Sequence, residues 1–478
     1  MTCIKRVMII TAAFFLHPAV FAEDGVPAIE RLLAGYLEND AALRELAVKT
    51  RQAELARERA GIKQGFDFNL STGNTRLSFE NGGTELSVAP KAELSLPALN
   101  GTSLIFSTPM VVEGGGSGSG FALENAQLSL STNITSKYRK QREITLLKAD
   151  RALLEARRAL NERALLAEKT FFETLRSLYD AEIQALSNEE NAYTKEIELA
   201  VAVSQGHPPS SVKYRTLKLE AEDALRAAEE ERRLLARKIA GFSRDCGLEF
   251  NVMPQYKAQS VEGNALESEA DFGQDEQKPR FSAVESAKWR AFLGKLERDA
   301  AGDLEIKAQG GFTAWNTNFD KQLSADAGIT LDWKGMIFAL GTQVPIYGEE
   351  KYPAFSLSLG FQAGKHRAAA LTGEEKRLAA ETESLAVMNA SRAWEDAVDT
   401  VRDERDGLIW EKQRLAQQHT LYAELLRDTQ ALYNQGYISE SEYGKTVANE
   451  KRAKYRLLAV EVKIRVHLIN SALYFVEE

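Results

Sequence analysis

The sequence predicts an α+β protein in which long helical coiled-coil hairpins alternate with blocks of β-strands, in an order repeated in both halves. Over 136–241, neighbouring pairs of apolar residues recur about every seven positions, which is the coiled-coil period. Over 66–134 and 304–364, apolar residues alternate with polar ones, as in strands with one apolar face. Gly206 and Gly436, which follow the two longest helices, lie 230 residues apart, close to half of the 478-residue chain. This spacing predicts a two-fold duplication.

Residues 1–22 have the three-part layout of a secretory signal peptide. Lys5 and Arg6 precede an apolar run from Val7 to Leu16, and Ala22 stands at the expected cleavage point. The alternative, a membrane-spanning helix, would need about 20 apolar residues. Cleavage after Ala22 would leave 58 basic and 69 acidic residues and a formal charge of −11, which disfavours a nucleic-acid partner.

The first repeat is predicted to span 23–241. It begins with a helix at 28–63, whose apolar residues share one side, and continues with strands at 66–134. A very long helix and a return helix then fill 136–241. Because adjacent residues on a helix point about 100° apart, each apolar pair serves two seams. The long helix is therefore expected to have a neighbour on each side, as in a wall of helices.

The second repeat, 281–478, is predicted to have the same order of elements. A helix at 281–301 precedes strands at 304–364, and a helical hairpin follows at 367–474. This hairpin turns at Gly436, as the first one turns at Gly206.

Residues 242–280, between the repeats, are polar and acidic. Such a charge run is usually a solvated loop, and we interpret it as an inter-repeat linker. Cys246 lies in this segment and is the one cysteine left after Cys3 is removed with the signal peptide. We expect it to be an incidental linker residue, because one thiol cannot form an internal disulfide framework.

The second helix turn carries a family motif. It consists of a glycine, two further residues, a serine or threonine, an acid and an apolar residue that opens the return helix, present here as Gly436-Tyr437-Ile438-Ser439-Glu440-Ser441-Glu442-Tyr443. In this motif and in the order of its elements over about 28–474, the chain resembles TolC-type outer-membrane efflux proteins. The first turn, Gly206-His207-Pro208-Pro209-Ser210-Ser211, is a weaker match that is one residue longer and lacks the acid.

This resemblance implies a homotrimer whose strands form one transmembrane β-barrel in outer-membrane lipid and whose helices form a periplasmic tunnel. Such a duct conducts substrates passively from periplasm to exterior, as the exit of a tripartite efflux pump or a type I secretion system. Its partners would be a periplasmic adaptor, also called a membrane fusion protein, and an inner-membrane pump that supplies the energy. The adaptor would dock at the tip formed by the two turns, through Gly206, Pro208, Pro209, Gly436, Ile438 and Ser439.

The resemblance also assigns two residues to a periplasmic constriction. Glu442 matches an acid that narrows the family's entrance, and Tyr433 matches a tyrosine that helps to hold the closed state. The match is partial, because a family arginine is replaced by Ile438 and a second acid by Lys445. The alternative for Glu442 is a capping box with Ser439, in which its carboxylate binds the start of its own helix.

The strand blocks depart from the family pattern. Family members contribute two long strands per repeat, whereas each block here has enough alternating sequence for four shorter segments. Either some of these segments form hairpins outside the membrane, or the barrel is wider than in the family. The sequence alone leaves both possibilities open.

Other classes of function are disfavoured by the sequence. The four histidines after the signal peptide are scattered without metal-ligand spacing, and no nucleophile lies beside a base, so neither an enzyme nor a cofactor is expected. A periplasmic coiled-coil adaptor or structural rod remains the main alternative, although it would not need two matching blocks of alternating strands. An ordinary porin would lack the paired helices.

Overall fold

The computed structural model describes residues 28–73, 75–80, 83–97, 99–114, 120–135, 137–256, 276–302, 304–316, 321–348 and 352–476. The predicted signal peptide at 1–22 and residues 257–275 of the predicted linker lie outside this part of the chain. The chain divides into two compact units, which are described separately. The helical unit comprises Met1–Val48, Arg157–Glu285 and Ala390–Glu478, and the sheet unit comprises Lys49–Ala156 and Ser286–Asn389.

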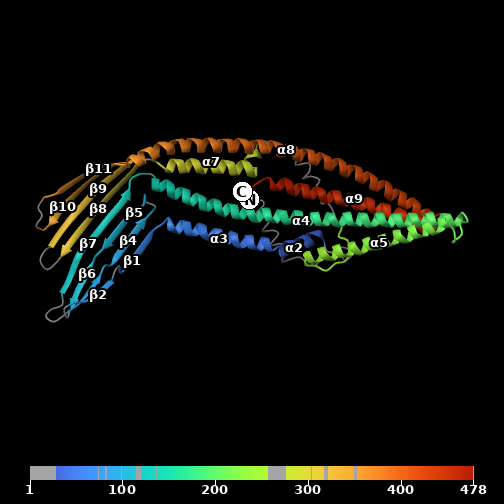
Figure 1. Ribbon diagram of the computed structural model, residues 1–478, viewed down its shortest axis with the longest axis horizontal. Helices are drawn as coiled ribbons and strands as arrows, with labels where there is room; N and C mark the ends of the chain where they lie inside the picture. The colour runs from blue at the N-terminus through green and yellow to red at the C-terminus, as the bar shows by residue number, and fades with distance from the viewer. Residues whose placement is uncertain are drawn as a thin grey trace. The chain divides into compact units, whose positions relative to one another are not determined.

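Helices account for most of the described residues (Figure 1). They are α2 (Ile29–Asn39), α3 (Ala41–Lys63), α4 (Lys137–Ser204), α5 (Val212–Asp245), the short 3₁₀ helix η2 (Lys278–Arg280), α7 (Ser282–Ala300), α8 (Ala363–Asn434) and α9 (Glu440–Leu473). The two longest, α4 and α8, have 68 and 72 residues and lie where the sequence predicts the long helices. Among the described residues, no helix contains an apolar stretch long enough to cross a membrane.

The helix predicted at 28–63 is two helices, α2 and α3, that meet at Asp40. The backbone of Asp40 is extended, with ψ of 106°, which interrupts the helix. Its carboxylate accepts hydrogen bonds from the backbone N–H groups of Ala42 at 2.8 Å and Leu43 at 3.2 Å, as an N-cap residue does. The same carboxylate forms an ion pair with Arg163 of α4 at 2.6 Å. The predicted single helix is thus wrong at this residue, because the aspartate side chain satisfies the N–H groups that open α3.

Ion pairs within the helical unit give the order α5, α4, α9, α8. Arg232 of α5 binds Glu182 of α4 at 2.7 Å, and Arg452 of α9 binds Glu190 of α4 at 2.5 Å. Four pairs join α9 to α8: Lys463 with Glu411, Lys412 with Glu461, His419 with Glu450, and His467 with Glu404. Helix α4 therefore has a neighbour on each side, as its paired apolar residues predict.

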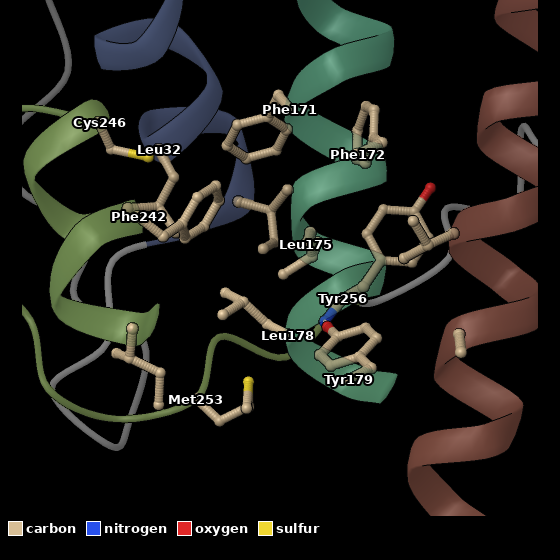
Figure 2. Close-up of a cluster of buried hydrophobic side chains, with 14 of the residues drawn as sticks. Leu32, Phe171, Phe172, Leu175, Leu178, Tyr179, Phe242, Cys246, Met253 and Tyr256 are labelled. Carbon is tan, nitrogen blue, oxygen red and sulfur yellow. The ribbon is translucent and has the colours of Figure 1, made fainter. Parts of the chain in front are cut away.

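The core of the helical unit contains a segment that the sequence assigns to the solvated linker. Phe242 and Cys246 at the end of α5, and Met253 and Tyr256 beyond it, are buried against Leu32 of α2, α4 and α9 (Figure 2). The prediction of a solvated loop is therefore wrong for 242–256. The prediction failed because the acidic residues that follow dominate the composition of 242–280, whereas 242–256 itself is rich in apolar side chains.

Tyr179 of α4 holds this segment by two hydrogen bonds. Its hydroxyl donates to the carbonyl oxygen of Pro254 at 2.9 Å and accepts from the backbone N–H of Tyr256 at 2.8 Å. Tyr179 is fully buried, and burial raises the pKa of its hydroxyl well above the usual value. A buried hydroxyl bonded on both sides replaces water for two backbone groups that would otherwise be unpaired.

The described strands of the sheet unit form one antiparallel sheet (Figure 1). Eight strands follow the order β1-β4-β5-β7-β8-β9-β10-β11, while β2, β3 and β6 pair beside them. Their bounds are β1 (Asp67–Ser71), β2 (Thr75–Glu80), β3 (Gly83–Val88), β4 (Lys91–Leu96), β5 (Thr102–Ser107), β6 (Met110–Gly114), β7 (Gly120–Asn133), β8 (Leu304–Asn316), β9 (Lys321–Trp333), β10 (Met336–Tyr347) and β11 (Ala354–Phe361).

Among the described residues, the second block contains the four predicted strands. The first block contains seven, because three of its four predicted segments are each interrupted and form two strands. One segment is interrupted at Ala89 and Pro90, between β3 and β4. Another is interrupted at Thr108 and Pro109, between β5 and β6. The two breaks lie opposite each other, since Val88 pairs with Met110 and Lys91 with Ser107. Proline has no N–H to donate to a neighbouring strand, which explains why both segments are interrupted at this point.

Candidate functional site

The two helix turns close α4 and α8 in the same way. In each, a glycine with φ of +78° stands after the last turn of the helix, namely Gly206 and Gly436. The N–H of Gly206 donates to the carbonyl of Val203 at 3.0 Å, and the N–H of the next residue donates to Ala202 at 3.2 Å. The second turn repeats this pattern with Gly436 and Tyr437 as donors. These are Schellman motifs, in which glycine is favoured because other residues adopt positive φ at a cost.

The turns differ in length more than the sequence predicts. Serine caps the return helix in both: the Oγ of Ser211 accepts from the backbone N–H of Tyr214, and that of Ser439 from the backbone N–H of Glu442. Ser439 follows Gly436 by three residues, whereas Ser211 follows Gly206 by five. The first turn is therefore two residues longer, not one, because the cap is Ser211 rather than Ser210. Pro208 and Pro209 lie exposed in the added length.

Glu442 forms the capping box that the sequence allows. Its carboxylate accepts hydrogen bonds from the backbone N–H of Ser439 at 2.8 Å and from the Ser439 hydroxyl at 3.0 Å. The bond from the Ser439 N–H, followed by that from its hydroxyl, lowers the pKa of the Glu442 carboxyl below its ordinary value. Glu442 is an exposed residue, so its carboxylate stays accessible to ions while bound at the helix start. Its place in a constriction remains a prediction.

Tyr433 and Tyr443 stack across the second turn. Their ring centroids are 4.7 Å apart and the ring planes differ by 9°. This contact joins the last turn of α8 to the first turn of α9 and so fixes the geometry around Gly436. Sequence reasoning selected Tyr433 but missed Tyr443, whose role depends on a partner across the turn.

Three contacts join the second hairpin to α4 beside the turns. The hydroxyl of Ser441 donates to the carboxylate of Glu196 at 2.8 Å, and Asn449 binds Glu190 at 3.2 Å. Gly444 lies so close to Tyr193 that a Cβ there would come within 2.9 Å of the ring. These contacts bring the return helix of the second hairpin against the long helix of the first. The sequence contains no signal for them, because the partners are more than 200 residues apart.

A groove of about 700 Å³ lies between α4 and α5 on the same part of the helical unit. Its walls include Tyr193 and Glu196 of α4 and Leu225 of α5. Arg232 closes one side, where it binds Glu182 and Glu189, and these bonds, led by that to Glu189, raise the pKa of its guanidinium. The groove is open to solvent, and no group of three or more acidic, histidine or cysteine side chains among the described residues is placed to hold a metal ion.

One face of the sheet is apolar. Cross-strand register places Phe68, Leu94, Leu104 and Leu130 in one row, and Ile329, Leu340 and Leu357 in another. Exposed members of this face are Phe68, Leu70, Phe106, Leu130, Phe312, Ile329, Phe338, Leu340, Phe355, Leu357, Leu359 and Phe361. Phe355 and Leu357 are 76% and 70% exposed. A continuous exposed apolar face of this kind marks a surface that contacts another protein or a membrane.

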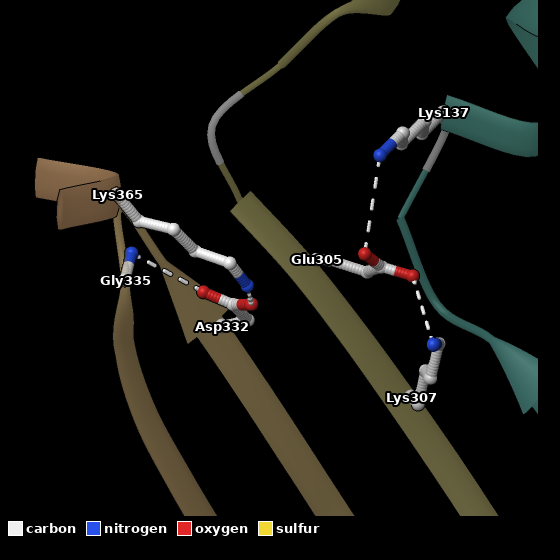
Figure 3. A network of polar contacts seen from close by, with 6 residues as sticks. All are labelled: Lys137, Glu305, Lys307, Asp332, Gly335 and Lys365. Carbon is white, nitrogen blue, oxygen red and sulfur yellow. Dashed lines mark hydrogen bonds and ion pairs between the residues drawn. The ribbon is translucent and has the colours of Figure 1, made fainter. Parts of the chain in front are cut away.

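The opposite face of the sheet is polar. The hydroxyls of Ser103 and Ser131 lie 2.8 Å apart, and Gln343 donates to Ser324 at 3.2 Å. Where the strands join α4 and α8, Glu305 lies between Lys137 and Lys307, at 3.9 and 3.1 Å, and Asp332 accepts from Lys365 and from the N–H of Gly335 (Figure 3). The two faces follow from alternation along each strand, because successive side chains point to opposite sides.

Two family models match the chain. The model of the TP096X N-terminal domain matches residues 32–262, and the model of the TP096X C-terminal domain matches residues 275–478. The chain carries both TP096X domains. The boundary between these TP096X domains, 263–274, falls inside the segment interpreted as an inter-repeat linker. No curated protein matches the chain.

The titles of three solved structures that are similar to this TP096X chain describe membrane proteins. A membrane protein from Pseudomonas aeruginosa is 16% identical, with a TM-score of 0.44, over 93% of this chain and 89% of that one. The outer-membrane channel OprN is 12% identical, with a TM-score of 0.47, over 92% and 89%. The MtrE outer membrane channel of Neisseria gonorrhoeae, in its open state, is 12% identical, with a TM-score of 0.44, over 92% and 88%.

Proposed function

We propose that the protein is an outer-membrane exit duct that conducts substrates passively from the periplasm to the exterior. The observation that carries this proposal is the exposed apolar face of the sheet, which lies back to back with a polar face. Strands with one apolar and one polar face suit a wall between lipid and water. Exposed phenylalanine and leucine side chains along β11 would be unfavourable in water, and burial in lipid offsets this by about 25 cal/mol per Å² of apolar surface.

The duct needs several copies of the chain. Within the described sheet, β1 pairs on one side with β4, and β11 pairs on one side with β10. Backbone groups at an open edge cannot remain unpaired in lipid, so each edge must pair with another strand. Pairing of β1 with β11 of the next copy would close one barrel, and the resemblance noted from the sequence indicates three copies. The described sheet is eight strands across, which favours a barrel wider than in the family over hairpins outside the membrane.

The helix turns are the proposed contact with a periplasmic adaptor and, through it, with an inner-membrane pump. The two turns are fixed by Gly206, Gly436 and Ser439. The side chains that the turns would offer to an adaptor are those of Pro208, Pro209 and Ile438. Tip and adaptor would then define which pump or secretion system the duct serves. A structural rod, the alternative, would use the same helices but gives no reason for an apolar face on eleven strands.

Matched substitutions in β11 test the proposal. Leu357 lies on the apolar face and Ser358, its neighbour in sequence, on the opposite one. Leu357→Arg should lower the yield of outer-membrane protein, because arginine on the lipid face of a barrel costs about 2–4 kcal/mol near the membrane centre. Ser358→Arg adds the same charge on the water face, so that yield should stay near wild type while single-channel conductance changes.

The readout is the amount of each variant that fractionates with outer membranes as a heat-modifiable oligomer. Equal losses in both variants would contradict the assignment of faces. A wild-type protein that remains soluble in the periplasm would overturn the duct itself and favour the rod.

A further inference from the structure

The polar face of β8, β9 and β10 carries mostly small side chains. Cross-strand register places Gly328 of β9 directly opposite Gly341 of β10, and both belong to the face opposite Ile329 and Leu340. Gly311 of β8 lies on the same face. So do four small hydroxyl residues: Thr313, Thr330, Ser356 and Ser358. A charge in the middle of this surface is therefore not covered by large neighbours.

Asp326 is the charged residue in the middle of this surface. Register places it between Gly311 of β8 and Gln343 of β10. Its carboxylate lies over Gly311, where an added Cβ would come within 3.0 Å of Oδ1. On the other side, the Gln343 amide donates to the Ser324 hydroxyl at 3.2 Å and not to Asp326. Within the part of the chain that the structure describes, no hydrogen bond or ion pair holds the Asp326 carboxylate, so its negative charge is uncompensated.

The other described charges at this face of β8–β11 lie where the strands meet α4 and α8, in the network of Figure 3: Lys137, Glu305, Lys307, Asp332 and Lys365. Lys307 stands four residues along β8 from Gly311, or about 13 Å at 3.3 Å per residue. It pairs with Glu305, which is two residues farther from Gly311. Because salt screens charges over about 8 Å, the network does not neutralise Asp326.

The polar face of the first block carries charges that lie farther from Asp326. Glu93 of β4 is in the same register row, but it pairs with Lys91 at 2.9 Å, and β5, β7 and β8 separate β4 from β9. At least three other strands separate β9 from β1, β2 and β3, which carry the remaining described charges of this face: Asp67, Arg76 and Glu85. Asp326 is therefore an isolated negative charge on the polar face.

We propose that Asp326 makes the duct favour cations over anions at the level of the middle of the sheet. The inference rests on the proposed function, because solutes pass the polar face only if the sheets of several copies close into one barrel. Each copy would then place one Asp326 at the same level of the lumen. Rings of acidic side chains select cations, since their negative potential raises the local concentration of cations and lowers that of anions. The solutes favoured would be inorganic cations and organic amines.

Planar-bilayer recordings test this selectivity. Asp326→Asn removes the charge with almost no change of shape and should lower the ratio of K⁺ to Cl⁻ permeability about threefold. Asp326→Glu keeps the charge and should stay near wild type. The control is the double variant Lys91→Gln with Glu93→Gln, which removes one positive and one negative charge from the same face and should leave the ratio unchanged.

A reporter cysteine measures the potential beside Asp326 itself. Thr313 of β8 lies diagonally across from Asp326, at about 7–8 Å. In a Cys3→Ser, Cys246→Ala background, Thr313→Cys should react faster with a cationic methanethiosulfonate than with an anionic one. Adding Asp326→Asn should lower this ratio of rates about fivefold at low ionic strength, and less in high salt.

The outcomes separate the selectivity from the duct. A fall of both ratios in Asp326→Asn, with Asp326→Glu near wild type, supports the proposal. Unchanged ratios in Asp326→Asn, or an equal fall in Asp326→Glu or in the double control, overturn it while the duct stands. A wild-type protein that forms no channels in bilayers would instead contradict the proposed duct. The yield of heat-modifiable oligomer shows that each variant is folded.

Discussion

The backbone N–H of Ser439 donates to the carboxylate of Glu442 at 2.8 Å, and the N–H of Glu442 donates in return to the Ser439 hydroxyl at 3.2 Å. This reciprocal pair satisfies two of the N–H groups that a helix start leaves free. The equivalent position at the start of α5 is Tyr214, so the first turn has the serine cap without the returning carboxylate. The two turns therefore share their glycines but differ in charge.

Glu442→Gln separates the capping role from the proposed constriction. Glutamine keeps a side chain that can cap but removes the negative charge. If three copies of Glu442 surround the entrance, their charge attracts cations, and the variant should lose cation selectivity and block by divalent ions in reconstituted channels. Wild-type conductance and selectivity in the variant would leave Glu442 as a cap alone.

The pH dependence of the cap has a defined sign. Because hydrogen bonds from Ser439 lower the pKa of Glu442 in the folded protein, its stabilising effect is present above the ordinary glutamate pKa and is lost as pH falls through the lower, folded value. The difference in melting temperature between wild type and Glu442→Ala should therefore be largest near neutral pH and shrink below about pH 4. The group is exposed, so a small difference is expected. A difference that grows on acidification would contradict the cap.

Ile438→Glu tests the adaptor contact. Ile438 is half-buried in the two-residue connection after Gly436. A carboxylate there would disfavour an apolar docking contact but would not alter the Schellman motif, which uses backbone groups. Transport should fall at least tenfold in cells while the amount of oligomer stays unchanged. Tyr437→Glu, which changes an exposed neighbour, shows whether added charge alone has this effect.

Tyr179→Phe should destabilise the helical unit by about 1–3 kcal/mol, because it leaves the carbonyl of Pro254 and the N–H of Tyr256 without their buried partner. Denaturant unfolding measures this loss. Tyr214→Phe removes a hydroxyl from a half-buried residue near the first turn and should change stability by much less. Equal effects in the two variants would mean that the bonds of Tyr179 contribute little.

Cys246 should be unreactive in the folded protein. Burial, with a smaller effect of Asp245, raises the pKa of its thiol to about 12, whereas the thiolate is the reactive form. In a Cys3→Ser background at pH 8, maleimide labelling should be roughly a thousandfold slower than for a cysteine placed in the exposed turn by Ser210→Cys with Cys246→Ala. Denaturant should remove most of the difference. Rapid labelling of the folded protein would show that 242–256 opens readily.

Local patterns in the sequence determined the kinds of element and several of their ends. The period of seven predicts α4, and the period of two predicts which strand residues share a face, because both periods are properties of the single element. Gly206 and Gly436 mark the turns, since positive φ is a local requirement. Glu442 could be assigned a capping box from Ser439 three residues before it. The turn at Gly436 resembles the family motif more closely than the turn at Gly206 does.

Only the tertiary structure decided what depends on partners far apart in the chain. Asp40 divides the first predicted helix while pairing with Arg163, 123 residues away. Residues 242–256 enter the core because their apolar side chains pack against α2, α4 and α9, and Tyr179 bonds two of their backbone groups. Periodicity records which side of an element is apolar, but the neighbour that covers it is set by packing between distant segments.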